Sequence, residues 1–518
     1  MRLLETVAVF FEVPIAVPAP NLVYPIILRA FVAAGAGGLA VLGFAPFSFF
    51  PAALLSLALL YELLSRPLVR GSFLIGWGFG IGLLGFGIFW IRISLNQYGN
   101  MAPWLAHLMT ALLVVSMALY YGVAGWLVSR LAAGPRWSGP LLVFPAAFVL
   151  TEWARGWFFT GFPWLAIGYT QIDSPLSGLA PLVGVYGISL AVALSAGLLW
   201  GLVRWPGRVR YAALAGLCLI WLAGAALSRV EWTEPDGEGF KATVLQANIQ
   251  QSLKWDPDAR IPTLRTYLEL TRDNWDSDLI VWPETAVPDF LHQVRNAFIE
   301  PLAEEAREQG AELVIGVPVM DLEAQTYFNG LISVGSFDDL YRKRHLVPFG
   351  EFIPFRSLLG PLAEAFEVPM SDFSSGDAPR PLLQVGEHLA GVSICYEDVF
   401  PSEAIEALPD AAYLINVSND AWFGDSLAPH QHLEMARMRA LENERWLVRS
   451  TNTGISAILD HRGDVVGVVP SFERGAFTAD VQPRRGATPF VHLGNWFAIG
   501  AAFSMLAIAF LLGRRRGA

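Results

Sequence analysis

The feature that most constrains this fold is the uneven distribution of polar residues along the chain. No lysine occurs before Lys241, and the chain up to that point consists of apolar runs interrupted by occasional arginines. From about residue 229 to residue 482 the composition becomes that of a soluble acidic segment. Charged residues make up 16% of the chain, against roughly 25% in soluble domains. We therefore predict a membrane part joined to a water-exposed part.

A membrane-spanning helix needs about 20 mainly apolar residues. Eight stretches approach this requirement, at 25–43, 47–65, 72–92, 104–128, 140–158, 178–203, 210–228 and 493–512. The first two are the least regular, because Pro46 and Pro51 crowd their junction and Arg29 lies within the first. The sequence thus predicts an α-helical bundle of about eight transmembrane helices.

Arginines occur in alternate loops between these stretches, at 66–70, 130–136 and 204–210. The intervening loops 94–100 and 160–164 contain neither lysine nor arginine. The positive-inside rule places the arginine loops, and the final sequence GRRRGA, in the cytoplasm. The water-exposed segment between the seventh and eighth spans is then expected outside the cytoplasm.

Four regions are therefore expected along the chain. Residues 1–23 form a leader, 24–229 contain seven membrane helices, 230–485 form the water-exposed domain, and 486–518 form the last helix with a basic tail. Acidic residues and prolines interrupt the leader, which favours an interfacial or disordered segment; a cleaved signal peptide is the alternative.

The water-exposed segment alternates short apolar runs with stretches of helical spacing. Helices are predicted at 262–275 and 432–446. Buried strands are predicted at 241–249, 278–284, 311–318, 329–335, 389–397, 411–419 and 453–460. This alternation indicates a layered α/β fold.

Charge and cysteine content exclude several classes of protein. The net charge of −11 argues against nucleic-acid binding, which needs a basic face. Cys218 lies in an apolar run, so a disulfide with the other cysteine, Cys395, is not expected. His345, His430 and His432 lack a convincing ligand pattern, and neither a metal nor a cofactor is predicted.

Three chemically capable side chains lie at or after the ends of predicted strands: Glu284, Lys343 and Cys395. Ligands gather at the carboxyl ends of strands in layered α/β folds. A carboxylate can accept the proton of the thiol. An ammonium can stabilise the thiolate and then the oxyanion of a tetrahedral intermediate. The backbone N–H of Tyr396 is a second candidate donor to that oxyanion. Such a set performs acyl transfer through a thioester, provided that the three side chains lie within hydrogen-bond reach.

Each of these residues has a simpler explanation when taken alone. A single cysteine such as Cys395 is more often a small buried hydrophobe. Glu284 is compatible with a cap or a surface position, and Lys343 belongs to a basic cluster that is compatible with a solvated face. The positions of these three residues in the sequence therefore support no more than the hypothesis that the protein is a cysteine enzyme.

The sequences WPE (282–284), YRKRHLVPFGE (341–351) and CYED (395–398), in this order, resemble the carbon–nitrogen hydrolase, or nitrilase, superfamily. The resemblance covers about residues 241–481 and implies an αββα sandwich with a Glu-Lys-Cys triad. The loop SNDAWFG (418–424) and the flanking spans make the resemblance more specific. Within the superfamily, the chain resembles the integral-membrane branch that acylates bacterial lipoproteins.

This resemblance implies that Glu284 is the general base, Lys343 stabilises the oxyanion and Cys395 is the nucleophile. The implied enzyme is a ping-pong acyltransferase of the bacterial inner membrane. Its acyl donor is a phospholipid, typically phosphatidylethanolamine, and its acceptor is the amine of an S-diacylglyceryl-cysteine lipoprotein. A monomer is expected.

The resemblance also implies supporting residues. Glu351 is expected to orient Lys343, Trp255 to lie near the substrate entrance, and Tyr396 and Glu397 to be needed beside the nucleophile. Asn329 and Asn419 are weaker matches, for which a structural role is equally compatible.

Three further hypotheses concern lipid contact. Residues 355–370 are predicted to form a lipid-contact arm on the bilayer, with a buried helix as the alternative. Arg92 and Arg155 lie near the outer ends of spans and are candidates for binding lipid head groups, although snorkelling to the interface is the simpler explanation.

Two other functions share some of these features. A membrane-tethered amidase that hydrolyses a small amide would use the same triad, but it would not need so many spans. A transporter with an inactive nitrilase-like binding module is the other alternative. It is disfavoured because all three triad positions are filled and the spans carry few charges.

Overall fold

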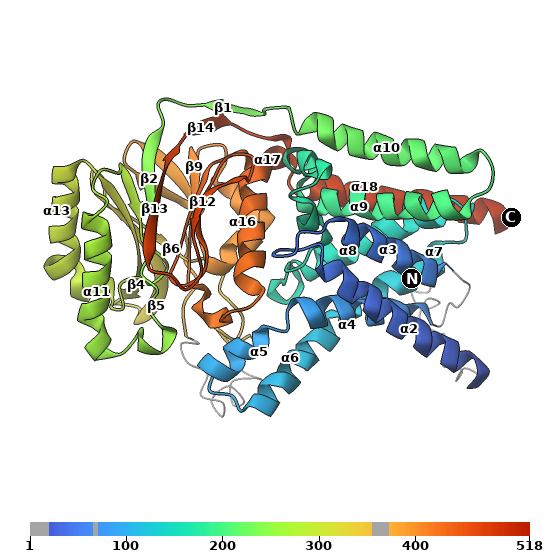
Figure 1. Ribbon diagram of the computed structural model, residues 1–518, viewed down its shortest axis with the longest axis horizontal. Helices are drawn as coiled ribbons and strands as arrows, with labels where there is room; N and C mark the ends of the chain where they lie inside the picture. Colours follow the sequence, from blue (N-terminus) through green and yellow to red (C-terminus); the bar gives the residue numbers. More distant parts are fainter. Residues whose placement is uncertain (1–19, 66–70, 355–371, 518) are drawn as a thin grey trace, which may run out of the picture.

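The computed structural model of this chain describes residues 20–65, 71–354 and 372–517. Figure 1 shows a helical part on one side and two β-sheets with flanking helices on the other. The predicted arm at 355–370 and most of the predicted leader at 1–23 lie outside the described residues.

The helical part contains all of the predicted apolar stretches. Its main helices are α2 (Pro20–Val41), α3 (Pro51–Leu64), α4 (Ser72–Gly87), α5 (Ile91–Ile93), α6 (Pro103–Met117), α7 (Leu119–Leu131), α8 (Phe144–Arg155), α9 (Ala180–Arg204), α10 (Val209–Leu227) and α18 (Trp496–Gly517).

Four helical segments of the described chain are long and apolar enough to cross a membrane. They are Pro103–Leu131, Pro175–Arg204, Val209–Leu227 and Trp496–Arg515. A fifth is obtained if Ser72–Gly87 and Ile91–Tyr98, which are bent by 58° to each other, form one span. The other predicted spans coincide with shorter helices, such as Pro25–Val41 and Pro51–Leu64. Several apolar helices suited to a membrane are therefore present.

The second part is built on two six-stranded sheets. The first has the order β13 (Gly475–Val481), β2 (Phe240–Gln246), β3 (Leu279–Val281), β4 (Glu312–Asp321), β5 (Thr326–Val334) and β6 (Asp339–Arg342). The second has the order β12 (Val465–Val469), β11 (Ser456–Leu459), β10 (Leu447–Thr451), β9 (Tyr413–Ser418), β8 (His388–Ile394) and β7 (Leu382–Val385). Their central strands β2–β3–β4 and β8–β9–β10 are parallel.

Helices cover the outer faces of both sheets (Figure 1). Helices α11 (Pro257–Arg272) and α13 (Glu300–Gln309) pack on the first sheet, and their apolar residues join its core. Helix α16 (Ala428–Asn443) lies between the second sheet and the membrane helices. A separate apolar core fills the space between the sheets. The predicted αββα sandwich is confirmed.

Every predicted strand is present, although most are shorter than predicted. In the two six-stranded sheets, strands β6, β7, β10, β12 and β13 were not predicted from the sequence. Strand β10 is fully buried but contains Arg449, Ser450 and Thr451, which hide its apolar character. Strand β12 has the apolar sequence VVGVV, but most of its side chains are exposed. The helix predicted at 432–446 runs instead over α16 (Ala428–Asn443), because Glu444 adopts a left-handed conformation that ends it.

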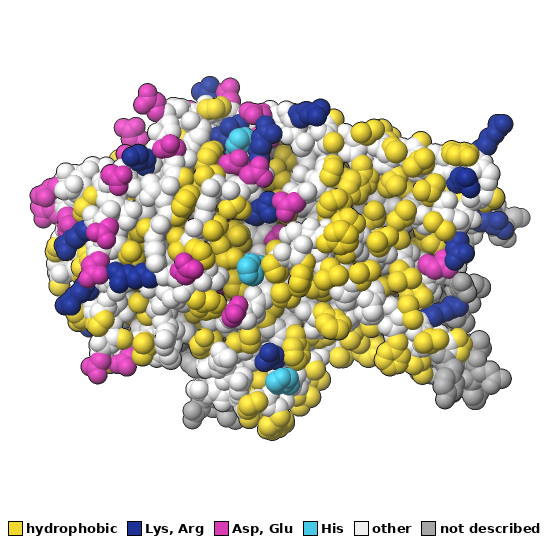
Figure 2. All heavy atoms as spheres, in the orientation of Figure 1, with side chains coloured by type: hydrophobic (Ala, Val, Ile, Leu, Met, Phe, Trp, Pro, Cys, Tyr) yellow, Lys and Arg dark blue, Asp and Glu magenta, His cyan; other side chains and the backbone are white. Residues whose placement is uncertain are grey.

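The chain passes from the helical part to the sheets and later returns, and these two connecting segments lie side by side. Strand β1 (Thr233–Pro235), which follows α10, pairs antiparallel with β14 (Arg484–Gly486), which precedes α17 (Pro489–Leu493) and α18. Figure 2 shows charged side chains gathered over the sheets and at the far end of the helices, with a broad apolar surface between them. This distribution suits a bilayer around the helices.

Candidate active site

Cys395 lies immediately after β8, at the first position of the short helix η8 (Cys395–Val399). It is buried, with 8% of its surface exposed. Its φ of +54° lies in the left-handed region, which is costly for a residue with a side chain. Such strain is found preferentially at functional sites. The conformation therefore supports a special role for this cysteine.

Glu284 and Lys343 follow β3 and β6, two strands of the first sheet, whereas Cys395 follows β8 of the second. Lys343 Nζ lies 3.9 Å from Glu284 Oε1, which is an ion-pair distance but longer than a hydrogen bond. The charges of both residues act on the Cys395 thiol. The two sheets thus bring the predicted triad into one cluster.

The expected hydrogen bond between Glu284 and Lys343 is replaced by bonds to two other side chains. Lys343 Nζ donates to the Glu351 carboxylate at 2.9 Å. Asn329 Nδ2, on β5, donates to Glu284 Oε1 at 2.6 Å and to Glu351 Oε1 at 3.3 Å. Asn329 therefore joins the two carboxylates, and Glu351 holds the ammonium.

The surroundings of the Cys395 thiol favour its protonated form. Burial raises its pKa most, and the Glu284 carboxylate raises it further, while Lys343 lowers it. A preformed thiolate is therefore not favoured. The arrangement instead suits transfer of the thiol proton to Glu284 as sulfur attacks a carbonyl carbon.

A second buried ammonium, that of Lys254, was not predicted from the sequence. Lys254 Nζ donates to the Glu284 backbone carbonyl at 3.2 Å, and its side chain is buried. Burial lowers the pKa of Lys254 to about 8, although the charges of Glu284 and Cys395 oppose this shift. In the sequence, Lys254 is a lysine next to a tryptophan in a polar stretch, and nothing in this pattern indicates a buried site residue. Only the fold reveals that Lys254 faces the triad.

Glu397 lies two residues after the nucleophile but binds backbone and phenol groups. Its Oε1 accepts from Tyr341 Oη at 2.8 Å and from the backbone N–H of Arg344 at 2.7 Å. Its Oε2 accepts from Ile394 N–H at 2.7 Å. Glu397 thus ties the segment carrying Lys343 to the end of β8.

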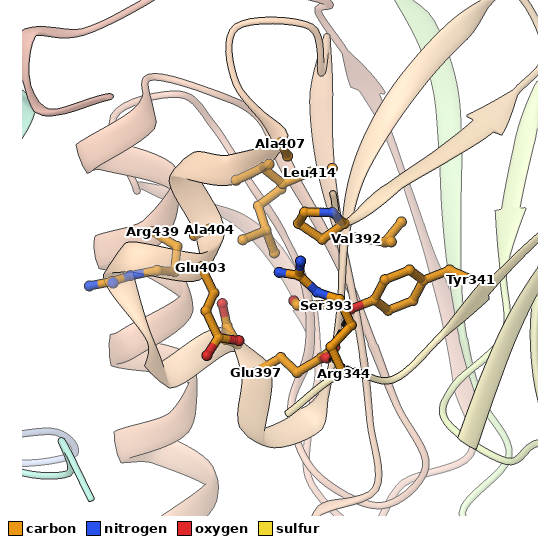
Figure 3. Close-up of a pocket in the computed structure, with 14 residues that line it drawn as sticks. Tyr341, Arg344, Val392, Ser393, Glu397, Glu403, Ala404, Ala407, Leu414 and Arg439 are labelled. Atoms are coloured by element: carbon orange, nitrogen blue, oxygen red, sulfur yellow. Dashed lines mark hydrogen bonds between the residues drawn. The ribbon is translucent and has the colours of Figure 1, made fainter. Parts of the chain in front are cut away.

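Figure 3 shows Glu397, Tyr341 and Arg344 beside a cavity of about 30 Å³. A space of this size holds about one water molecule. The triad does not line it, so this cavity belongs to the scaffold behind the nucleophile and not to a lipid-binding site.

Tyr396 joins the nucleophile segment to the membrane part. Its Oη donates to the Gly161 carbonyl at 3.0 Å, in a loop between membrane helices. His345 extends this junction, because its ring is 2.6 Å from Glu403 Oε1, 3.1 Å from the Thr160 carbonyl, and stacked on Phe400. The site is therefore built against the membrane-helix loops.

The other predicted site residues lie at its periphery. Trp255 is 43% exposed and follows the buried Lys254. Asn419 is buried and donates to Gln251 Oε1 at 2.8 Å. Arg155 is buried and donates to the carbonyls of Phe162 and Trp164 at 2.5 and 2.6 Å, so it stabilises a loop within the protein and is not placed to hold a head group.

A buried network of charged side chains lies next to the strand ends that carry the site. Asp420 contacts His432 Nδ1 at 2.9 Å and Arg449 at 3.0 Å. Burial pushes its pKa upward, but His432 and Arg449 outweigh this effect and lower the pKa to about 2. Asp420 is therefore a fixed negative charge near Cys395, whose pKa it raises.

The fold and cluster define a catalytic domain of the carbon–nitrogen hydrolase class carried on a bundle of apolar helices suited to a membrane. Residues 241–489 match the family described as Carbon-nitrogen hydrolase, and residues 36–198 match the Apolipoprotein N-acyltransferase N-terminal domain. A solved structure of Nit3 from Saccharomyces cerevisiae, of the nitrilase superfamily, covers 49% of this chain and 93% of its own, with 20% identity and a TM-score of 0.37.

Two curated relatives match almost end to end. The apolipoprotein N-acyltransferase of Methylococcus capsulatus is 44% identical over 489 residues, covering 94% of this chain and 97% of its own. That of Pseudomonas syringae pv. tomato is 42% identical over 474 residues, covering 90% and 93%. The chain belongs to the apolipoprotein N-acyltransferase family, which confirms the predicted resemblance.

Proposed function

We propose that this protein transfers a fatty acyl chain from a phospholipid to the N-terminal amine of S-diacylglyceryl-cysteine lipoproteins, through a thioester on Cys395. The cluster of Cys395, Glu284 and Lys343 at strand ends of both sheets is the observation that carries this proposal. The near full-length match to relatives named for this activity supports it.

In the first half-reaction, Cys395 Sγ attacks the ester carbonyl carbon of the phospholipid, for which phosphatidylethanolamine is the expected donor. The thiol proton passes to Glu284 as the C–S bond forms. The Lys343 ammonium and the Tyr396 backbone N–H stabilise the oxyanion. The C–O bond then breaks, Glu284 returns the proton to the leaving oxygen, and a lysophospholipid departs from the thioester.

In the second half-reaction, the lipoprotein α-amine attacks the thioester carbonyl carbon. Glu284 accepts a proton from the attacking nitrogen, and the same donors stabilise the oxyanion. Breakage of the C–S bond yields the amide, and Glu284 returns the proton to Cys395 sulfur. Atoms and protons balance over the cycle, and no cofactor is needed.

The surrounding residues act through the triad. Glu351 and Asn329 hold Lys343 and Glu284 in place, and Glu397 fixes the two segments that carry Lys343 and Cys395. Trp255, which is exposed beside the site, is proposed to contact the lipid as it enters.

The proposed setting is the bacterial inner membrane, crossed about eight times by residues 24–229 and 486–518. Residues 230–485 form the catalytic domain on the periplasmic side, and 1–23 form the leader. Helix α9 ends on the side of the helical part away from the sheets (Figure 1). Its last residue, Arg204, pairs with Glu62, and this position supports cytoplasmic arginine loops. A monomer is proposed because one chain supplies the whole cluster.

The test is an acyl-transfer assay with purified protein, phosphatidylethanolamine and a diacylglyceryl-cysteine peptide. The wild type should form the N-acyl amide, while Glu284→Gln and Lys343→Met should lose it. Gln309→Leu, at an exposed position on α13, is the matched control. Release of free fatty acid without amide would instead support transfer of the acyl group to water, the hydrolytic chemistry of the alternative, which the relatives do not favour.

A further inference from the structure

A cavity of about 450 Å³ opens where the membrane helices meet the catalytic domain. Phe86 and Phe89, around the bend between α4 and α5, line one side of it. Asp425 and Leu427, which precede α16, line the other side. The cavity is thus formed jointly by the two parts of the protein.

Two opposite charges line this cavity without neutralising each other. Arg92, Asp425 and His430 belong to its wall. No ion pair is found for Arg92 or Asp425 among the described residues, although the Asp425 charge acts on the half-buried His430 ring. The buried Nε of Arg92 has no hydrogen-bond partner among the described residues. Its guanidinium lies 5.3 Å from the centre of the Phe89 ring, which holds it beside the cavity. A buried unpaired donor of this kind favours a ligand.

The apolar side of the cavity continues onto the outer surface of the helices. The side chains of Phe86 and Phe89 are 67% and 39% exposed. Exposed apolar patches of this kind mark sites of membrane or ligand contact. A ligand here would therefore have a charged end between Arg92 and Asp425 and an apolar end along the phenylalanines.

The cavity is close to the proposed nucleophile but separate from it. The short helix η10 (Asp420–Phe423) lies between them, with Asp420 acting on Cys395 and the Phe423 ring packed 4.7 Å from that of Trp90. Ser94 Oγ also donates to the Trp422 carbonyl at 2.7 Å, which fixes α5–η1 to this segment. The cavity wall and the catalytic loop are one connected unit.

We infer that this cavity binds the head group of a zwitterionic glycerophospholipid, with the Arg92 guanidinium on the phosphate and the Asp425 carboxylate on the primary ammonium. The glycerol and first methylenes lie against Phe86 and Phe89. A free phosphate offers the same anion, but it would leave Asp425 and the apolar wall unused. The inference rests on the proposed use of phospholipid by this enzyme.

The test measures lipid binding to detergent-solubilised full-length protein by native mass spectrometry, in a Cys395→Ala background that prevents turnover. Arg92→Gln should weaken binding of both phosphatidylethanolamine and phosphatidylglycerol by about tenfold, the effect of losing one charge-assisted bond. Asp425→Asn should weaken phosphatidylethanolamine alone. Arg130→Gln, an exposed arginine at the end of α7, is the matched control.

Equal binding by Arg92→Gln and Arg130→Gln would overturn the inference, as would displacement of phosphatidylethanolamine by millimolar inorganic phosphate. Arg92→Lys keeps the charge and should retain binding, so a folding defect is separated from loss of the cation. Amide formation by the wild type tests the proposed function independently. A protein that forms amide but shows no Arg92 dependence would contradict only the head-group site.

Discussion

Two carboxylates follow Cys395 in sequence, yet neither is placed to be its base. Glu397 points to backbone N–H groups and Tyr341, and Asp398 lies 3.7 Å from Arg449. The carboxylate with the largest effect on the thiol is that of Glu284, from the opposite sheet, and Asp420 adds a smaller one. The reactivity of this cysteine therefore depends on residues that are remote in sequence.

Replacing the nucleophile tests this residue directly. Cys395→Ser should bind phospholipid normally but form no acyl-enzyme, because a hydroxyl has a far higher pKa than a thiol and the same Glu–Lys pair does not activate it. The measurement is intact-protein mass after incubation with phospholipid. Acylation of the serine at a rate near that of the wild type would show that the nucleophile is misassigned.

Lys254 should give the enzyme an alkaline limit. Burial lowers the pKa of Lys254 to about 8. The side chain is therefore charged below pH 8 and loses its charge as the pH rises through 8. Its positive charge favours the negative charge that develops on Cys395 sulfur during the reaction, so thioester formation should decline above that pH. Lys254→Arg should move the decline to higher pH, and Lys254→Met should slow the step about tenfold or more at pH 7, the factor for roughly 1.4 kcal/mol.

The measurement for Lys254 is the pH profile of single-turnover thioester formation in the three proteins. A purely structural lysine would change the stability or the amplitude but would leave the alkaline limit where it is. An unchanged limit in Lys254→Arg would therefore count against an electrostatic role.

At the scale of elements, helix α16 is the connector between the catalytic domain and the membrane helices. Gln431 Oε1 accepts from the indoles of Trp90 and Trp164 at 3.2 and 2.7 Å, and its Nε2 donates to the Gly87 carbonyl at 3.1 Å. Glu442 Oε1 accepts from Val185 N–H at 2.6 Å. The two parts are thus joined by buried polar bonds.

Gln431→Leu should destabilise this junction, because it leaves two indole N–H groups and a carbonyl without partners. Each unsatisfied buried group costs about 1–3 kcal/mol. We expect a lower midpoint of thermal unfolding and reduced acyl transfer, with Gln309→Leu on α13 as the control. A midpoint equal to that of the control would mean that the junction does not contribute to stability.

Glu442 should make the same junction sensitive to pH. Burial raises its pKa to about 7, against the opposing effect of Arg439. Because the raised pKa favours the protonated form in the folded state, the contribution to stability is full below about pH 4.5 and is lost as the pH rises through 7. Glu442→Gln should remove this component, so the difference in thermal midpoint between variant and wild type should change between pH 5 and 8.

The sequence predicted β3 and β8, which Glu284 and Cys395 follow as the ends of short apolar runs, but it did not predict β6, which precedes Lys343. It could not predict the bonds of α16, because Gln431 and Trp90 are 341 residues apart and their pairing depends on the packing of the two parts. Lys254 was missed for the same reason. Residues at strand ends were predictable, while buried polar partners from distant segments were not.

At the scale of the whole molecule, an apolar surface separates the charged catalytic domain from arginines at the far end of the helices (Figure 2). The sequence predicted this division from the polarity of the chain, although several of the predicted spans are shorter or more bent than expected. Tyr396 and Gly161 place the nucleophile segment against a membrane-helix loop. The proposed site therefore lies beside the helical part of the protein.

The proposed orientation is testable by cysteine labelling in a Cys218→Ala background. Glu387→Cys, on the exposed surface of the sheets, should react with a membrane-impermeant maleimide in intact spheroplasts. Arg208→Cys, in an arginine loop, should react only after permeabilisation. The reverse pattern would place the catalytic domain in the cytoplasm.

The central claim is that one cysteine accepts the acyl chain from a phospholipid and passes it to an amine. Intact-protein and peptide mass spectrometry after incubation with phosphatidylethanolamine measures this most directly. We expect one acyl group on Cys395, stable in buffer and discharged when a diacylglyceryl-cysteine peptide is added, with the amide appearing in equal amount. No adduct on Cys395, or an adduct that water removes as quickly as the peptide does, would contradict the account.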